Sequence, residues 1–109
     1  MEIKNAVIKS ATITNQDHGC LSVWVHVDYG GAGQGFGGYN LGRANPKELS
    51  KGGNIGSHFI ARCMDVAGVS EWSQMAGKTI RVKGSDSKIE AIGNIINDNW
   101  FNPTEDFAD

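Results

Sequence analysis

Residues 28–40 read Asp-Tyr-Gly-Gly-Ala-Gly-Gln-Gly-Phe-Gly-Gly-Tyr-Asn, and glycine occupies every second position from 31 to 37. In an extended segment, successive side chains point to opposite faces. Because glycine loses more conformational freedom on folding than any other residue, so dense a run implies that a ring, another backbone or a ligand approaches the bare face. We expect close packing first and direct ligand contact second. The other face carries Ala32, Gln34, Phe36 and Gly38.

The segments on both sides of this run have the pattern of β-strands. Residues 20–29 alternate cleanly, with aliphatic residues on one face and Trp24 and His26 beside an acid on the other. Residues 2–14 are rich in β-branched residues and lead into turn residues. The glycine run continues into residues 39–43, so the simplest arrangement is a three-stranded antiparallel meander whose third strand contains the glycines, and a loop is the alternative. Because such residues are unusual on a plain solvated surface, we expect the face with Trp24 and His26 to be an interface or a pocket wall.

The second half of the chain changes its pattern from a period of two to a helical period and back. The elements expected there are a mobile connection at 44–54, a main helix that ends at Gly68, a short helix at 69–77 capped by Ser70, and a hairpin of strands 78–83 and 89–96. The sequence therefore predicts an α+β fold: an antiparallel sheet of about five strands with one main helix and one short helix.

Length and charge limit the possible classes of protein. A chain of 109 residues forms one domain, which we place at residues 1–103, followed by an acidic, frayed tail at 104–109. The net charge is −2 and no basic cluster occurs, so binding to a DNA or RNA backbone is not expected. No signal-peptide layout is present and no apolar run approaches the ~20 residues of a membrane span. We expect a soluble cytoplasmic protein with no membrane partner.

The chain shows no convincing catalytic or metal-binding set. The glycines at 33, 35 and 38 match the dinucleotide-binding pattern, but a strand follows them where that motif needs a helix. Cys63 falls in the apolar stripe of the main helix, and His58, five residues earlier, is not on the same helical face. Neither Cys20 nor Cys63 has the spacing of a metal site. We therefore expect a protein that is not an enzyme, with no catalytic residue, no metal and no cofactor.

The three arginines of the chain, Arg43, Arg62 and Arg81, are the residues best suited to hold phosphate groups, because a guanidinium fork matches phosphate geometry. Taken singly, each is more commonly a solvated surface charge. Aromatic residues such as Phe36 and Trp24 can stack a base, although aromatic residues of a small domain are usually in its core.

Four sequences taken together carry a resemblance to a known family. They are the run from Asp28 to Tyr39, then His58-Phe59-Ile60 leading to Trp72, then Gly77-Lys78-Thr79-Ile80-Arg81-Val82, and finally Ile92-Gly93-Asn94 with Trp100-Phe101-x-Pro103. Through them, most of residues 1–103 resembles a family of small phage proteins, the Thoeris anti-defence sponges of the first type. The glycine run is the most specific part of the resemblance.

The resemblance implies a viral anti-defence protein that acts in the host cytoplasm. It implies assembly as a homo-oligomer and the sequestration, without cleavage, of a small-molecule cyclic nucleotide signal of the glycosylated cyclic ADP-ribose type. Some members also hold cyclic oligonucleotides. On residue type, with arginines for phosphates, aromatic rings for the base and amides for polar edges, the candidate ligand-binding residues are Gln34, Phe36, Arg43, His58, Arg62, Arg81 and Asn94.

Two other functions remain open at this point. The chain can instead be a protein-directed inhibitor of a host defence complex, with the Trp24 face and the acidic tail as its contact surface. An enzyme that acts on a nucleotide comes third, because it needs a general base together with a nucleophile or a metal.

Overall fold

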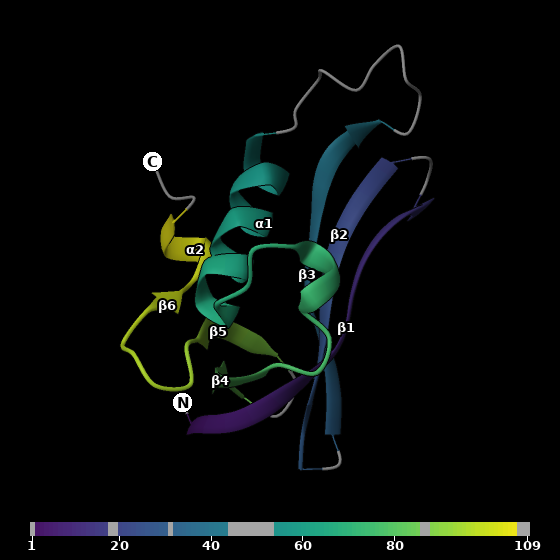
Figure 1. The fold of residues 1–109 in the computed structure, drawn as a ribbon. Helices are drawn as coiled ribbons and strands as arrows, with labels where there is room; N and C mark the ends of the chain where they lie inside the picture. The colour runs from purple at the N-terminus through teal and green to yellow at the C-terminus, as the bar shows by residue number, and fades with distance from the viewer. Residues whose placement is uncertain (1, 18–19, 31, 44–53, 86–87, 107–109) are drawn as a thin grey trace.

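The computed structural model describes residues 2–17, 20–30, 32–43, 54–85 and 88–106. Within them, six strands form one antiparallel sheet, and a long helix packs on one face of it (Figure 1). The predicted α+β class with one main helix is confirmed, and the sheet has six strands where about five were expected. The elements are β1 (Glu2–Asp17), β2 (Cys20–Tyr29), β3 (Ala32–Arg43), α1 (Asn54–Ala67), the 3-10 turn η2 (Trp72–Gln74), β4 (Thr79–Gly84), β5 (Ile89–Gly93), β6 (Trp100–Phe101) and α2 (Pro103–Asp106).

The sheet has the strand order β3-β2-β1-β4-β5-β6, and it curves around α1 so that both of its ends contact that helix. The ring centroid of Phe59, on α1, lies 5.4 Å from that of Phe36 on β3 and 5.7 Å from that of Phe101 on β6. The rings of Phe36 and Phe101 lie 6.1 Å apart, although their strands stand at opposite ends of the strand order. The core is therefore enclosed between α1 and the concave face of the sheet.

Helix α1 forms where the sequence predicts it because its apolar residues recur at helical spacing. Phe59, Cys63 and Val66 are fully buried, and the helix ends at Gly68 in the left-handed conformation with φ +74. The N–H groups of Gly68 and Val69 both donate to the Met64 carbonyl. This carbonyl in the last turn of the helix therefore has hydrogen-bond partners. Within the described residues, no helix is long and apolar enough to cross a membrane.

The glycine run forms β3, as expected, but its alternation does not continue unbroken to residue 37. The register between β2 and β3 shifts after Val23, and both Gly37 (φ +126) and Gly38 (φ +81) are left-handed. Because a bulge adds one residue, Gly37 turns its bare side to Phe59 on α1 and Gly38 turns its own to Trp24. The bare face away from α1 therefore runs through 33, 35 and 38.

Several boundaries differ from the predicted ones. The short helix expected at 69–77 is a single 3-10 turn, and the residue before it is Glu71, which forms a capping box with Gln74, rather than Ser70. Strand β5 ends at Gly93, because Asn94 accepts from two backbone N–H groups and turns the chain. Most of the connection expected at 44–54 lies outside the described residues, and Asn54 already belongs to α1.

The C-terminal part of the domain contains two elements that the sequence did not predict. Trp100–Phe101 pairs with β5 as β6, and Pro103–Asp106 forms α2 where a frayed tail was expected from Thr104 onward. Two residues are too few to show a strand period, and α2 is held by side chains of α1 rather than by its own propensity. Residues 107–109 lie outside the described part of the chain.

Candidate functional site

Around β2, the face of the sheet that points away from α1 carries aromatic and charged side chains instead of the usual polar ones. Trp24, His26 and Asp28 alternate with the buried valines of β2, and they lie opposite the bare positions of β3. The Trp24 and His26 rings are nearly parallel, with centroids 6.1 Å apart and an interplanar angle of 17°. This is the face that the sequence identified as an interface or a pocket wall.

The indole of Trp24 covers part of the bare glycine surface. A Cβ at Gly35 would lie 3.1 Å from its Cε3 atom, and a Cβ at Gly38 would lie 2.8 Å from its Cζ2 atom. The imidazole of His26 lies next to it, and its Cε1 atom would be 3.6 Å from the same Cβ at Gly35. Most of the close approach that the glycines permit is thus made by side chains of this domain.

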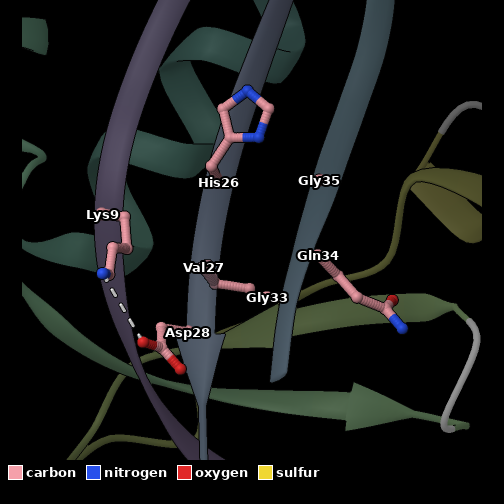
Figure 2. Close-up of a pocket in the computed structure, with 7 residues that line it drawn as sticks. All are labelled: Lys9, His26, Val27, Asp28, Gly33, Gln34 and Gly35. Atoms are coloured by element: carbon pink, nitrogen blue, oxygen red, sulfur yellow. Dashed lines mark ion pairs between the residues drawn. The ribbon is translucent and has the colours of Figure 1, made fainter. Parts of the chain in front are cut away.

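An open groove of about 430 Å³ continues this surface toward the start of β3 (Figure 2). Its volume falls within the ~300–1,000 Å³ of small-molecule sites. Figure 2 shows Lys9 and Asp28 side by side at one end, His26 at the other, and the Gln34 side chain pointing away from both. The groove is lined by Lys9, His26, Val27, Asp28, Gly33, Gln34 and Gly35.

Lys9 reaches the groove because it follows the buried Ile8 and therefore lies on the outer face of β1, as Val7 does. Ile8 pairs with Val27 and Ser10 pairs with His26, so Lys9 is the extra residue between two consecutive pairs. A bulge of this kind places two successive residues opposite one residue of the partner strand, so the alternation of β1 is displaced only after Lys9. The Lys9 Nζ atom lies 3.7 Å from Asp28 Oδ2, and the Lys9 side chain is 65% exposed. Such an exposed pair contributes about 0–1 kcal/mol, so both charges are available to a bound molecule.

The groove has the volume of a small-molecule site, but its lining does not form a nucleophilic catalytic set. It offers an ammonium group, a carboxylate, an imidazole and bare peptide, with no hydroxyl or thiol among its seven residues. Cys63 lies in the core, where burial raises the pKa of its thiol, so that it stays protonated and inert at neutral pH. Among the described residues, no group of three His, Cys, Asp or Glu side chains is placed to hold a metal ion.

Of the predicted ligand residues on β3, the structure places one in the groove. Gln34 is among its lining residues, although its side chain points away from the other groove side chains (Figure 2), whereas Phe36 is 4% exposed and packs against α1 in the core. Arg43 ends β3, and its side chain lies outside what the structure describes. Phe36 therefore has the core role that small domains usually give to aromatic residues.

His58 and Arg62 come together on α1, on the other side of the molecule's core from the groove. His58 Nε2 lies 3.2 Å from Asp106 Oδ2, and Arg62 Nε donates to the same carboxylate oxygen at 3.4 Å. Arg62 also donates to Asn99 Oδ1 at 3.1 Å and to the Trp100 carbonyl at 2.8 Å, and pairs with Asp65. In this structure Arg62 joins α1 to β6 and α2.

Arg81 and Asn94 form a second cluster between β4 and the turn after β5. Arg81 donates to the carbonyl groups of Asn94 and Asn97, each at 2.8 Å, and its guanidinium lies 4.8 Å from the centre of the Trp100 ring. The Asn94 amide donates to the Val66 carbonyl at 2.8 Å. The six candidates whose side chains are described thus lie in four places: Gln34 at the groove, Phe36 in the core, His58 with Arg62, and Arg81 with Asn94.

Gln34 is the only one of the seven groove residues that was predicted as a ligand residue, and Lys9 and Gly33 are among the six that were not. The signal for Lys9 is present in the sequence, because Lys9 alternates with the apolar Ala6 and Ile8, but alternation alone does not say that the outer face of the strand borders a groove. No family model, curated protein or solved structure matches this chain.

Proposed function

We propose that this chain is a non-catalytic phage protein that binds a cyclic, phosphate-containing adenine nucleotide and so sequesters an immune signal of the glycosylated cyclic ADP-ribose type. The proposal originates in the resemblance of residues 28–39 and the three later sequences to the Thoeris anti-defence sponges. The structural observation that supports it best is the groove beside Gly33. Its lining combines the ammonium group of Lys9, the imidazole of His26 and the backbone of glycines without side chains.

The chemistry of the groove suits binding and release rather than turnover. Lys9 offers an ammonium group to a phosphate, and Asp28 offers a carboxylate to sugar hydroxyls. The groove is open, and a flat ring can enter it from solvent beside the exposed His26 side chain. Sequestration requires only that the bound signal stay intact, so a general base without a nucleophile beside it is no disadvantage.

Release of the bound molecule tests this function directly. The purified protein is incubated with lysate of cells that make the signal, separated from unbound material, and denatured by heat, and the supernatant is analysed by mass spectrometry. We expect an intact adenine nucleotide that restores effector activity when it is added back. A cleaved product would show an enzyme, and an empty supernatant from a protein that still inhibits the defence would contradict the proposal.

A second candidate function is supported by apolar side chains on the same face of the sheet. Ile3 is 54% exposed and Val7 is 43% exposed, and Val7 pairs directly with Asp28 beside the groove. Such residues suit a protein contact, as a protein-directed inhibitor of a host defence complex would need. Inhibition that survives with an empty supernatant, together with co-purification of a defence protein, would favour this function.

A further inference from the structure

One glycine of β3 has no explanation within the domain. Among the glycines whose surroundings are described, each of the others either has a positive φ or would place a Cβ within 3.4 Å of another group. Gly33 has neither property: its φ is not left-handed, and a Cβ there would meet only the Val27 carbonyl oxygen, at 3.7 Å. Any small side chain fits at this position in the isolated domain.

Glycine in a strand nevertheless destabilises the fold by about 0.5–1 kcal/mol relative to alanine. A glycine that packing does not require is therefore placed for close approach by something outside the domain. Gly33 is exposed and lines the groove, so the approach is made from the groove side.

The kind of group that can approach Gly33 follows from sheet geometry. Backbone N–H and C=O groups lie within the plane of a sheet, so the face of a strand without side chains offers flat peptide units rather than hydrogen-bond donors. A flat ring gains contact area on such a surface, whereas a phosphate gains no donors there. The exposed imidazole of His26, which is paired with Gly35, borders the same surface two residues along the strand from Gly33.

The residues next to Gly33 form a row across three strands. Gly33 pairs with Asp28 on β2, and Asp28 contacts Lys9 on β1 at 3.7 Å. Two strand spacings separate β1 from β3 by about 10 Å, so the row has the length of an extended nucleotide. Its three chemical groups, a bare peptide, a carboxylate and an ammonium group, match base, ribose and phosphate in that order.

We infer that the peptide face of Gly33 is the floor on which the adenine ring of a bound nucleotide stacks, with the ribose hydroxyls at Asp28 and a phosphate at Lys9. This inference rests on the proposed function and assigns the binding site within it. It places the ligand on the side of the sheet away from Arg62, Arg81 and Asn94.

Substitution at Gly33 gives a sharp test because the fold does not need glycine there. Isothermal titration calorimetry with ADP-ribose and cyclic ADP-ribose compares the wild type with Gly33→Val and Gly33→Ala. We expect Gly33→Val to weaken binding by ~10-fold or more, which corresponds to the loss of about 1.4 kcal/mol, and Gly33→Ala to weaken it less. The thermal midpoint of both variants should equal or exceed that of the wild type.

Lys9→Ala separates the phosphate end from the base end. This variant should weaken binding of ADP-ribose but leave binding of adenosine unchanged, whereas Gly33→Val should weaken both. Lys78→Ala is the matched control, because Lys78 is an exposed lysine outside the groove.

The outcomes distinguish this inference from the proposed function. If the wild type binds ADP-ribose or cyclic ADP-ribose and Gly33→Val binds them equally well, the inference is overturned and the proposed function stands. If the wild type binds neither compound, the inference is overturned as well. The lysate experiment then decides the proposed function by itself. An empty supernatant in that experiment would contradict it.

Discussion

The indole ring of Trp24 lies directly over Gly38, where a Cβ would come within 2.8 Å of the Cζ2 atom of the ring. Gly35 lies beneath the same ring, where a Cβ would be 3.1 Å from Cε3. The glycines on β3 therefore leave room for a tryptophan on the solvent face of β2. The packing of the Trp24 ring in turn explains why positions 35 and 38 are glycine. The glycine run is a docking surface for this ring over part of its length and open over the rest.

Gly35→Val is expected to destabilise the fold by about 1–3 kcal/mol, because its side chain displaces the Trp24 ring from the sheet. The free energy of unfolding, measured with urea, checks this value. In a Trp24→Ala background the same change should cost much less, since the ring that it displaces is absent. Gly33→Ala is the control and should be as stable as the wild type or more stable by up to about 1 kcal/mol, because a Cβ there meets only ordinary contacts. Equal urea midpoints for Gly35→Val and the wild type would contradict this account of the strand.

Arg62→Ala is expected to destabilise the protein by about 2–4 kcal/mol, because it leaves the Trp100 carbonyl and the Asp106 carboxylate without their shared donor. The stability of Arg62→Lys should lie between that of the wild type and that of Arg62→Ala. An ammonium group keeps the charge but cannot donate to both partners at once as the guanidinium fork does. Thermal unfolding followed by circular dichroism provides the measurement, with Lys78→Ala as the surface control. If Arg62→Ala instead loses nucleotide binding at an unchanged thermal midpoint, the bridging role is contradicted and Arg62 is a ligand-binding residue.

Regular periodicity accounts for the parts of the fold that the sequence predicted. The alternation of residues 20–29 and the helical spacing of Phe59, Cys63 and Val66 each describe a face that must be buried, and both faces are in the core. The irregular parts were not predictable in the same way. The bulge at Gly37 and Gly38 depends on where Phe59 and Trp24 lie, and β6 depends on its pairing with β5.

The predicted ligand residues show a related limit. Arginine was selected for its chemistry, but the same fork that matches a phosphate also matches a cluster of backbone carbonyls, as Arg81 shows with Asn94 and Asn97. The sequence does not say which of the two a guanidinium meets. The alternation of β1 places Lys9 on its outer face, but the groove beside it depends on the pairing of β1 with β2 and of β2 with β3, which the sequence does not specify.

We expect the protein to form a homo-oligomer in solution. Ile3 and Val7 are exposed on the face of β1 away from α1, and the edge strand β3 carries no charged residue before Arg43. Charges commonly protect edge strands from pairing, so both features favour a contact between copies. Light scattering at micromolar concentration should give a multiple of 11.7 kDa, and Val7→Glu should lower that mass. A wild-type mass of a single chain would remove this prediction.

Cys63 should make the stability of the protein fall at alkaline pH. Burial raises the pKa of its thiol well above the ordinary value of 9.0, so the unfolded chain releases this proton near pH 9 while the folded protein retains it. The folded state then binds more protons than the unfolded state, and the free energy of unfolding falls by about 1.4 kcal/mol for each pH unit. Cys63→Ala lacks this contribution. The difference in stability between the wild type and Cys63→Ala, measured with urea from about pH 7 to 10.5, should be constant up to about pH 9 and then shift against the wild type. A difference that stays constant over the whole range would show that the thiol titrates equally in both states and is open to solvent in the folded protein.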